Sequence, residues 1–197
     1  MKSASSVSRK EQILSTAARL FSERGYSATS MRDIADALNI EAASLYNHIA
    51  SKEELLHTIC FTLAEKFLSA IDEVNDIYFN GEEKLRMAVK NHVEILTSNL
   101  EAAKVFLHEW RHLGGENLKE FIGLRDRYEG GIIEILKTGE QENLFSEVDK
   151  KFAALNILSS VNWIVEWYKS DGKMKPAAIA DKLCDFILSG LKKSKPF

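Results

Sequence analysis

Apolar residues recur along the chain at the spacing of one face of an α-helix. Between residues 9 and 24 they are Ile13, Leu14, Ala17, Leu20 and Phe21, a single stripe that predicts an amphipathic helix. Similar stripes predict helices at about 51–78, 82–98, 101–113, 116–138, 147–170 and 176–193. Only two prolines and ten glycines occur in 197 residues, which favours helix throughout because both residues destabilise helix interiors.

Cap signals set the starts and ends of the N-terminal helices. A serine is followed three residues later by Asp or Glu at positions 8, 30 and 51, the pattern of a capping box. Gly25 and Asn39 follow the first and second stripes, and both residue types accept the positive φ that ends a helix. Two short helices are therefore predicted, one opening after Ser30 and one at about 42–48.

Two short helices joined by a tight turn are typical of a helix-turn-helix. An ordinary helical hairpin is the alternative on spacing alone. We predict an all-α fold of about nine helices, with an N-terminal three-helix helix-turn-helix domain over residues 1–50 and a larger helical domain over residues 51–197.

Charge does not identify a nucleic-acid-binding protein here. The formal net charge is -3, and residues 1–60 carry seven Lys and Arg against seven Asp and Glu. A DNA-binding surface must therefore be local.

Targeting and cofactor signals are weak. The serine-rich start lacks the apolar centre of a signal peptide, and no apolar run is long enough to span a membrane, so we expect a cytoplasmic protein without a membrane partner. Cys60 and Cys184 match no metal-binding or redox spacing. They are expected to be buried thiols, and we expect no cofactor and no bound metal.

A more specific pattern runs from Ile13 to Leu56. The segments 29–35 (TSMRDIA), 45–48 (LYNH) and 51–55 (SKEEL) resemble the N-terminal domain of the tetracycline-repressor (TetR) family. The resemblance implies a transcriptional repressor, not an enzyme, that binds a palindromic double-stranded DNA operator as a homodimer and is released by a small-molecule effector.

The resemblance also implies contacts with the DNA backbone. Residues matching Tyr46, His48 and Lys52 hold phosphates in that family, and Ser30 and Arg32 resemble its second backbone contact. Hydroxyl, imidazole and ammonium groups all donate to phosphate oxygens, and Lys52 opens a helix whose dipole favours an anion. The alternatives are a core aromatic for Tyr46, a satisfied imidazole for His48 and a solvated cap residue for Lys52.

Base recognition departs from the common family pattern. Ser44 and Asn47 are the polar candidates, whereas Ala42 and Ala43 offer only apolar contact, for example with a thymine methyl. Glu41 would face a phosphate-rich surface, which is unfavourable.

The last two predicted helices carry apolar stripes suited to self-association, which would give the two-fold symmetry of a palindromic operator. Packing within a single chain is the alternative. The stripes are formed by Phe152, Leu155, Ile157, Leu158, Val161, Ile164 and Val165, and by Ile179, Leu183, Phe186, Ile187, Leu188 and Leu191.

The middle of the chain is the candidate effector region. Segments 106–113, 125–129 and 162–168 resemble the acyl-CoA-responsive branch of the family, which implies an apolar tunnel with an arginine near its mouth. A solid core is the alternative, because periodic aromatics usually pack. The candidate ligand residues are Phe67, Leu96, Phe106, Trp110, Arg111, Arg125, Tyr128 and Trp163.

A rival function comes from residues 108–112 (HEWRH). This is the H-E-x-x-H pattern of zinc metallohydrolases, in which one helix presents two imidazoles and a glutamate base. Glu129 or Glu134 would supply the third ligand. No other hydrolase feature accompanies the motif, so a packed helix with an ion-pairing edge is favoured. An activator or a DNA-organising protein with the same N-terminal domain is also compatible with the sequence.

Overall fold

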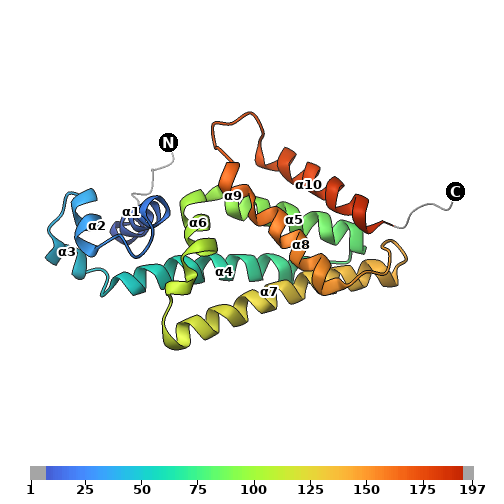
Figure 1. Ribbon diagram of the computed structural model, residues 1–197, viewed down its shortest axis with the longest axis horizontal. Helices are drawn as coiled ribbons and strands as arrows, with labels where there is room; N and C mark the ends of the chain where they lie inside the picture. The colour runs from blue at the N-terminus through green and yellow to red at the C-terminus, as the bar shows by residue number, and fades with distance from the viewer. Residues whose placement is uncertain (1–7, 193–197) are drawn as a thin grey trace, which may run out of the picture. The chain divides into compact units, whose positions relative to one another are not determined.

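The structure, a computed structural model, describes residues 8–192. The N-terminal segment in which we expect no signal peptide, and the predicted last helical residue 193, lie outside these residues. The described chain is helical, without a strand, and has one isolated bridge between Phe145 and Lys192. Figure 1 labels its ten α-helices and the colours follow the chain. The helices are α1 (Arg9–Arg24), α2 (Met31–Ala37), α3 (Ala42–Tyr46), α4 (Lys52–Asp76), α5 (Gly81–Ser98), α6 (Leu100–His108), α7 (Gly115–Gln141), α8 (Lys150–Asn162), α9 (Ile164–Trp167) and α10 (Pro176–Leu191), with a 3-10 turn η1 (Trp110–His112).

The all-α prediction is confirmed, and the described chain divides into two compact units. The first contains the described residues up to Leu63 together with Glu101–Phe121. The second contains Ala64–Leu100 and the described residues from Ile122 onward. Helices α4 and α7 each begin in the first unit and continue into the second.

In the first unit the predicted caps set the helix ends. Ser8 and Ser30 each form a complete capping box, with Glu11 and Asp33 respectively. Gly25 and Asn39 have φ of 86° and 53°, the positive values predicted for the ends of α1 and α2. At position 51 the box is only half formed, because the glutamate carboxylate at position 54 accepts from the amide of residue 50 instead.

Helix α6 ends earlier than its apolar pattern predicts. We expected a helix over residues 101–113, but α6 stops at His108 and the chain tightens into η1. Leu113 is extended and buried, and Gly115, the first residue of α7, has φ of 52°. The last turn of the predicted helix was therefore wrong.

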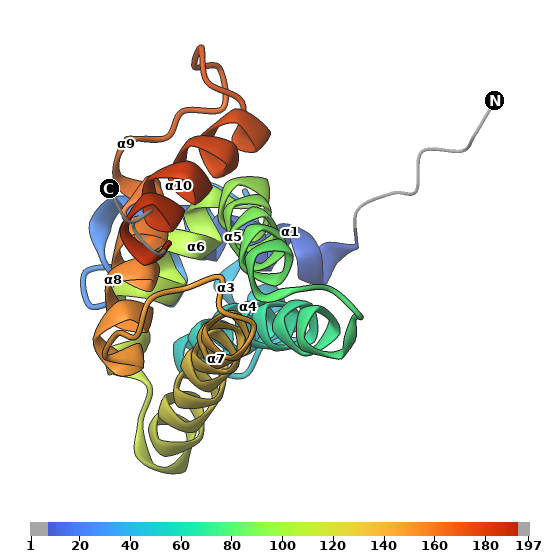
Figure 2. The same cartoon turned by 90° about the vertical axis from the view of Figure 1, so that its right-hand side faces the viewer.

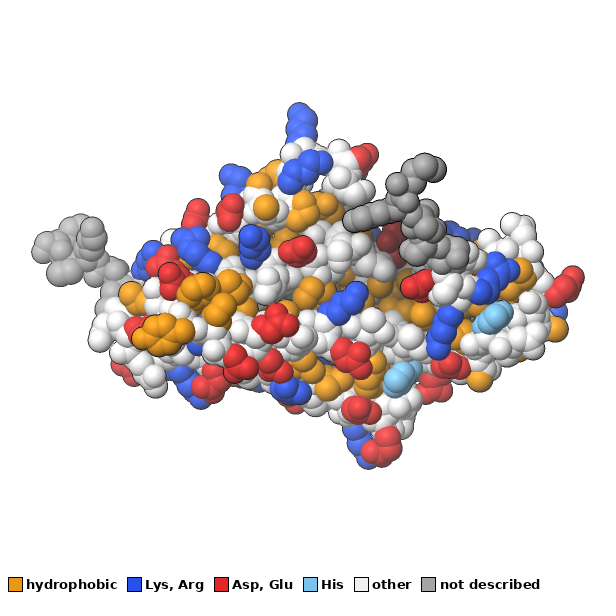
Figure 3. Space-filling model, turned by 180° about the vertical axis from the view of Figure 1, so that it is seen from behind, with side chains coloured by type: hydrophobic (Ala, Val, Ile, Leu, Met, Phe, Trp, Pro, Cys, Tyr) orange, Lys and Arg blue, Asp and Glu red, His pale blue; other side chains and the backbone are white. Residues whose placement is uncertain are grey.

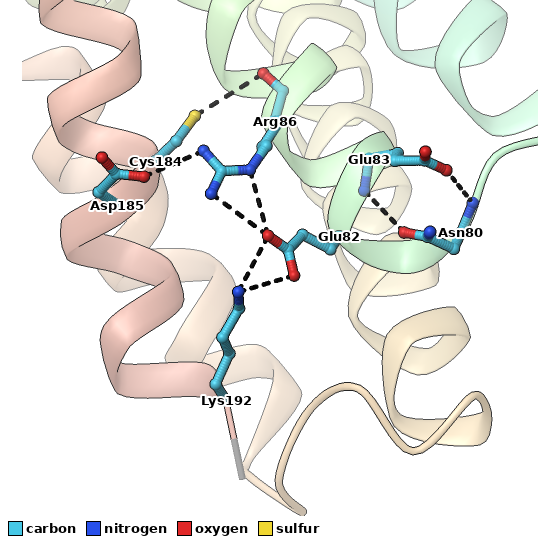
Figure 4. A network of polar contacts seen from close by, with 7 residues as sticks. All are labelled: Asn80, Glu82, Glu83, Arg86, Cys184, Asp185 and Lys192. Atoms are coloured by element: carbon cyan, nitrogen blue, oxygen red, sulfur yellow. Dashed lines mark hydrogen bonds and ion pairs between the residues drawn. The ribbon is translucent and has the colours of Figure 1, made fainter. Parts of the chain in front are cut away.

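In the second unit α5 and α10 lie side by side (Figures 1 and 2). Ion pairs join them at the surface, and Figure 4 shows the Arg86 guanidinium between Glu82 of its own helix and Asp185 of α10. Lys192 pairs with Glu82 as well, at 2.9 Å. Exposed pairs of this kind contribute little, so the contact is held mainly by its apolar residues. Those in the shared core include Leu85, Ala88, Val89, Ile179, Ala180, Ile187 and Leu188.

The predicted helix over residues 147–170 is split. The amide of Glu166 bonds to the carbonyl of Trp163, three residues back, at 3.1 Å, so the chain tightens between α8 and α9. This interruption accounts for ten helices where the sequence predicted about nine.

Two glycines of α7 lie in different environments. A Cβ built on Gly139 would lie 2.2 Å from the ring of Phe145, whereas one on Gly130 meets nothing within 4 Å. Replacing Gly139 by Ala should therefore destabilise the protein by about 1–3 kcal/mol through overpacking. Gly130→Ala, the matched control, should stabilise by up to about 1 kcal/mol because Ala favours helix. Denaturant unfolding measures both changes, and equal effects at the two positions would contradict this packing argument.

Candidate functional site

The predicted base-reading residues lie on helix α3 and directly after it. It has only five residues, and Leu45 anchors it because its side chain is fully buried. Ala43, Asn47 and His48 are exposed, Tyr46 is 54% exposed, and Ala42 and Ser44 are partly covered. The helix ends at Tyr46, so Asn47 and His48 follow it instead of completing the predicted last turn. Glu41 is the N-cap residue and makes no side-chain cap bond.

The start of α2 carries the second group of predicted DNA contacts. Ser30 and Arg32 are both exposed. The Ser30 hydroxyl already bonds to Asp33, accepting from its amide at 3.1 Å and donating to its carboxylate. These bonds from the Ser30 side chain and backbone hold the pKa of the Asp33 carboxyl below its usual range.

Lys52 has an internal role that its sequence position did not indicate. Its Nζ donates to the backbone carbonyls of Tyr26 and Thr29 at 2.9 and 2.8 Å. It also lies 4.3 Å from the centroid of the Tyr26 ring. An ammonium has three donors, and two of them are used in these bonds.

The HEWRH segment does not form the helical surface that the zinc hypothesis requires. His108 ends α6, and His112 lies in η1, so the two imidazoles are not on one continuous helix. Glu109 Oε2 accepts from the backbone amide of Tyr26 at 2.9 Å, and the His112 ring stacks on the Tyr26 ring with centroids 5.1 Å apart. Within residues 8–192, no group of three or more His, Cys, Asp or Glu side chains is arranged to hold a metal.

The eight candidate ligand residues divide between the two units. Phe106, Trp110 and Arg111 belong to the first, where both aromatic rings pack against Phe121 and the Arg111 guanidinium lies 4.5 Å from the Trp110 ring. The others belong to the second unit. There Phe67 and Leu96 are buried and Tyr128 is half-buried, whereas Arg125 and Trp163 are exposed.

His92 contacts two of the second unit's candidates, Phe67 and Tyr128, and the sequence analysis did not single it out. Its Nδ1 lies 2.8 Å from the Tyr128 hydroxyl, its Nε2 lies 2.9 Å from Asn162 Oδ1, and the Phe67 ring packs 4.6 Å away. The amide oxygen of Asn162 only accepts, so Nε2 carries the proton and Nδ1 accepts from Tyr128. Burial lowers the pKa of His92 to about 4. The sequence signal that could have found it is a polar residue on the helix face that also carries the buried Val89, Val93 and Leu96.

An open depression of about 350 Å³ also lies in the second unit. It involves none of the predicted ligand residues. Its lining is formed by Lys90, Glu94, Thr97, Ser98, Pro176 and Ala177.

The surface carries both signs of charge. On the face seen in Figure 3, basic and acidic side chains are interspersed, with hydrophobic side chains exposed between them. Among residues 8–192, the helices are all too short or too polar to cross a membrane.

Comparison with known proteins gives matches over both parts of the chain. Residues 13–59 match the family described as bacterial regulatory proteins, tetR family, and residues 79–191 match the tetracyclin repressor-like C-terminal domain. The HTH-type transcriptional repressor KstR2 of Rhodococcus jostii is 28% identical over 93% of this chain and 91% of that protein.

Solved structures agree with these sequence matches. The TetR family regulator PfmR of Thermus thermophilus is 35% identical, covers 92% of this chain and 99% of its own, and has a TM-score of 0.83. AibR, solved with isovaleryl coenzyme A and operator DNA, is 33% identical over 91% of this chain and 97% of its own, with a TM-score of 0.80. The fold and its helix-turn-helix thus define a DNA-binding transcriptional regulator. The chain belongs to the TetR family.

The buried imidazole makes stability depend on pH. The pKa of His92 falls from 6.5 to about 4 on folding, so the unfolded chain binds a proton more readily. Stability contributed by neutral His92 is present above about pH 6.5 and is lost as pH falls toward 4, by up to about 3 kcal/mol. Denaturant unfolding from pH 7.5 to 4.5 should show a weaker pH dependence in His92→Gln than in the wild type. His108→Gln is the control, and identical slopes in all three proteins would contradict the assignment.

Proposed function

We propose that this regulator is a repressor that binds a palindromic operator as a homodimer and is released by a small apolar or acyl-CoA-type effector. The observation that carries the proposal is the short helix α3, held inward by buried Leu45 while Ala43, Tyr46, Asn47 and His48 are exposed. A helix with this arrangement can enter the major groove without disturbing its own packing.

The proposed DNA contacts are of two kinds. Ser30, Arg32, Tyr46, His48 and Lys52 bind backbone phosphates, an assignment supported by the exposure of the first four and the one remaining Lys52 donor. Base contacts come from the α3 surface. They are assigned to Ala42, Ala43, Ser44 and Asn47.

Dimerisation is proposed through the outer faces of α8 and α10. Phe152, Leu155 and Phe186 are 68%, 45% and 73% exposed, and apolar groups of this size usually have a partner when they gather on one face. Much of the apolar pattern predicted for self-association points inward instead. Its buried members are Ile157, Val161, Ile164, Val165, Ile179, Ile187, Leu188 and Leu191.

The effector proposal has two supports. AibR, a relative over nearly the whole chain, was solved with isovaleryl coenzyme A. In the second unit His92 lies beside the apolar Phe67 ring, and a carbonyl oxygen could accept from its Nε2 in place of Asn162 Oδ1. Phe67, Leu96 and Tyr128 are the candidate contacts there, and Phe106, Trp110, Arg111, Arg125 and Trp163 remain proposed contacts.

We further propose a division of roles between two domains, a location and the absence of catalysis. Residues 1–50 form the DNA-binding domain and residues 51–197 the effector-binding and dimerisation domain. The protein acts in the cytoplasm, catalyses no reaction and needs no cofactor.

Selection of DNA by the purified protein from a random duplex pool tests the proposal. The enriched sites should be inverted repeats whose half-site centres lie about 34–36 Å or a multiple apart. Phe186→Glu should yield monomers in sedimentation and lower operator affinity by at least about a hundredfold, because each half-site then binds alone. Isovaleryl coenzyme A should dissociate the wild-type complex, whereas free coenzyme A should not.

Tyr78→Glu is the matched control for the dimer, because Tyr78 is fully exposed outside α8 and α10. Enrichment of single half-sites, or a dimeric Phe186→Glu protein, would contradict the dimer proposal. If neither isovaleryl nor longer acyl coenzyme A compounds change operator affinity, the acyl-CoA proposal is wrong.

Removal of the Lys52 ammonium separates its two roles. If its third donor binds a phosphate, Lys52→Ala should weaken binding evenly across sequences and lower the slope of log affinity against log salt by about one. If the ammonium only holds the carbonyls of Tyr26 and Thr29, affinity should fall with the slope unchanged. Salt titration by fluorescence anisotropy measures both quantities. Lys119→Ala, an exposed lysine paired with Glu116, is the control.

A further inference from the structure

The turn of residues 25–29 joins α1 to α2 and sets the direction in which α2 leaves α1. Inside the turn, the Thr29 hydroxyl donates to the Gly25 carbonyl at 2.9 Å, and its amide donates to the Tyr26 carbonyl at 3.2 Å. Thr29 is 1% exposed. These bonds fix the C-terminal half of the turn but leave the amide of Tyr26 without a partner in the turn.

That amide is bound by a residue far away in sequence. Glu109 Oε2 accepts from it at 2.9 Å. Glu109 follows the last residue of α6, and its own amide bonds to the Val105 carbonyl at 2.9 Å, so the backbone that carries the carboxylate is held by the helix. A bond to a charged acceptor is about twice as strong as a neutral one.

The Tyr26 ring is held on several sides. It packs edge-on against Phe21 and stacks on His112, with centroids 5.2 and 5.1 Å away, and the Lys52 ammonium lies over it. His112 Nε2 in turn lies 3.5 Å from Glu109 Oε2. Residues from the α6–η1 segment and from the start of α4 therefore meet on one turn of the helix-turn-helix region, all within the first unit.

We infer that Glu109 is a positioning residue for operator recognition, which acts on DNA binding through the Tyr26 amide without touching DNA. The inference rests on the proposed DNA-binding function. The inference also assigns a role to the HEWRH segment. Glu109 holds the turn through the Tyr26 amide, and His112 stacks on the Tyr26 ring. Glu109 and the turn belong to the same compact unit, and the bond from the Tyr26 amide to the Glu109 carboxylate is a direct link between the end of α6 and the turn.

The test compares three substitutions of Glu109 in the full chain. Glu109→Ala and Glu109→Met remove the acceptor, the second while keeping most of the side-chain volume. Both should lower affinity for the selected operator by about tenfold or more, the loss expected for a hydrogen bond to a charged group. Glu109→Gln keeps an oxygen that accepts the same bond, so its affinity should stay within about threefold of wild type.

Two further readouts separate positioning from general destabilisation. Hydrogen exchange at the Tyr26 amide should be at least about tenfold faster in the Ala and Met variants, with amides inside α1 unchanged. Affinity for random-sequence DNA should stay at the wild-type value, because phosphate contacts dominate non-specific binding. Glu116→Ala, an exposed glutamate of α7, is the matched control and should leave all three quantities unchanged.

The outcomes are distinct. Wild-type operator affinity in both the Ala and Met variants overturns the inference, even if the Tyr26 amide exchanges faster. An equal loss in Glu109→Gln also overturns it, because the acceptor would then not be the cause. Failure of the wild type to select any operator overturns the proposed function itself, and the inference with it.

Discussion

A helix of five residues does not hold its shape by its own hydrogen bonds. The cost of nucleation makes isolated helices shorter than about 12–15 residues marginal in water, and α3 and α2 have five and seven residues. Their geometry therefore depends on burial of Ile34, Leu45 and Ile49 and on the turns between them. Every residue proposed to contact DNA from these helices is positioned by that packing.

The turns of the first unit are as important as its core. Positive φ at Gly25 and Asn39 reverses the chain at each junction, and side chains from α4 and from the end of α6 bind the carbonyls and amide of the first turn. The turn of the helix-turn-helix is thus held in part by residues that are remote in sequence.

The second unit contains a polar group inside an apolar core. Burying His92 is unfavourable unless its two nitrogens are satisfied, and they are satisfied by Tyr128 of α7 and Asn162 at the end of α8. Such a group specifies how three helices meet, because any other arrangement would leave a buried nitrogen without a partner. Asn162 is also the last residue of α8 before the chain tightens.

Local signals in the sequence were sufficient to predict that the chain is helical, to place the capping boxes at Ser8 and Ser30, and to recognise the family. Periodicity and caps act between residues three or four positions apart, so one sequence determines them. The end of α6, the break before α9, the inward direction of Ile157 and Ile187, and the partners of His92, Lys52 and Glu109 were decided by the tertiary structure. Their physical reason is that a stripe of apolar residues does not specify which part of it is covered, and a motif such as HEWRH does not specify whether its helix continues. Only contacts between residues far apart in the chain decide those two questions.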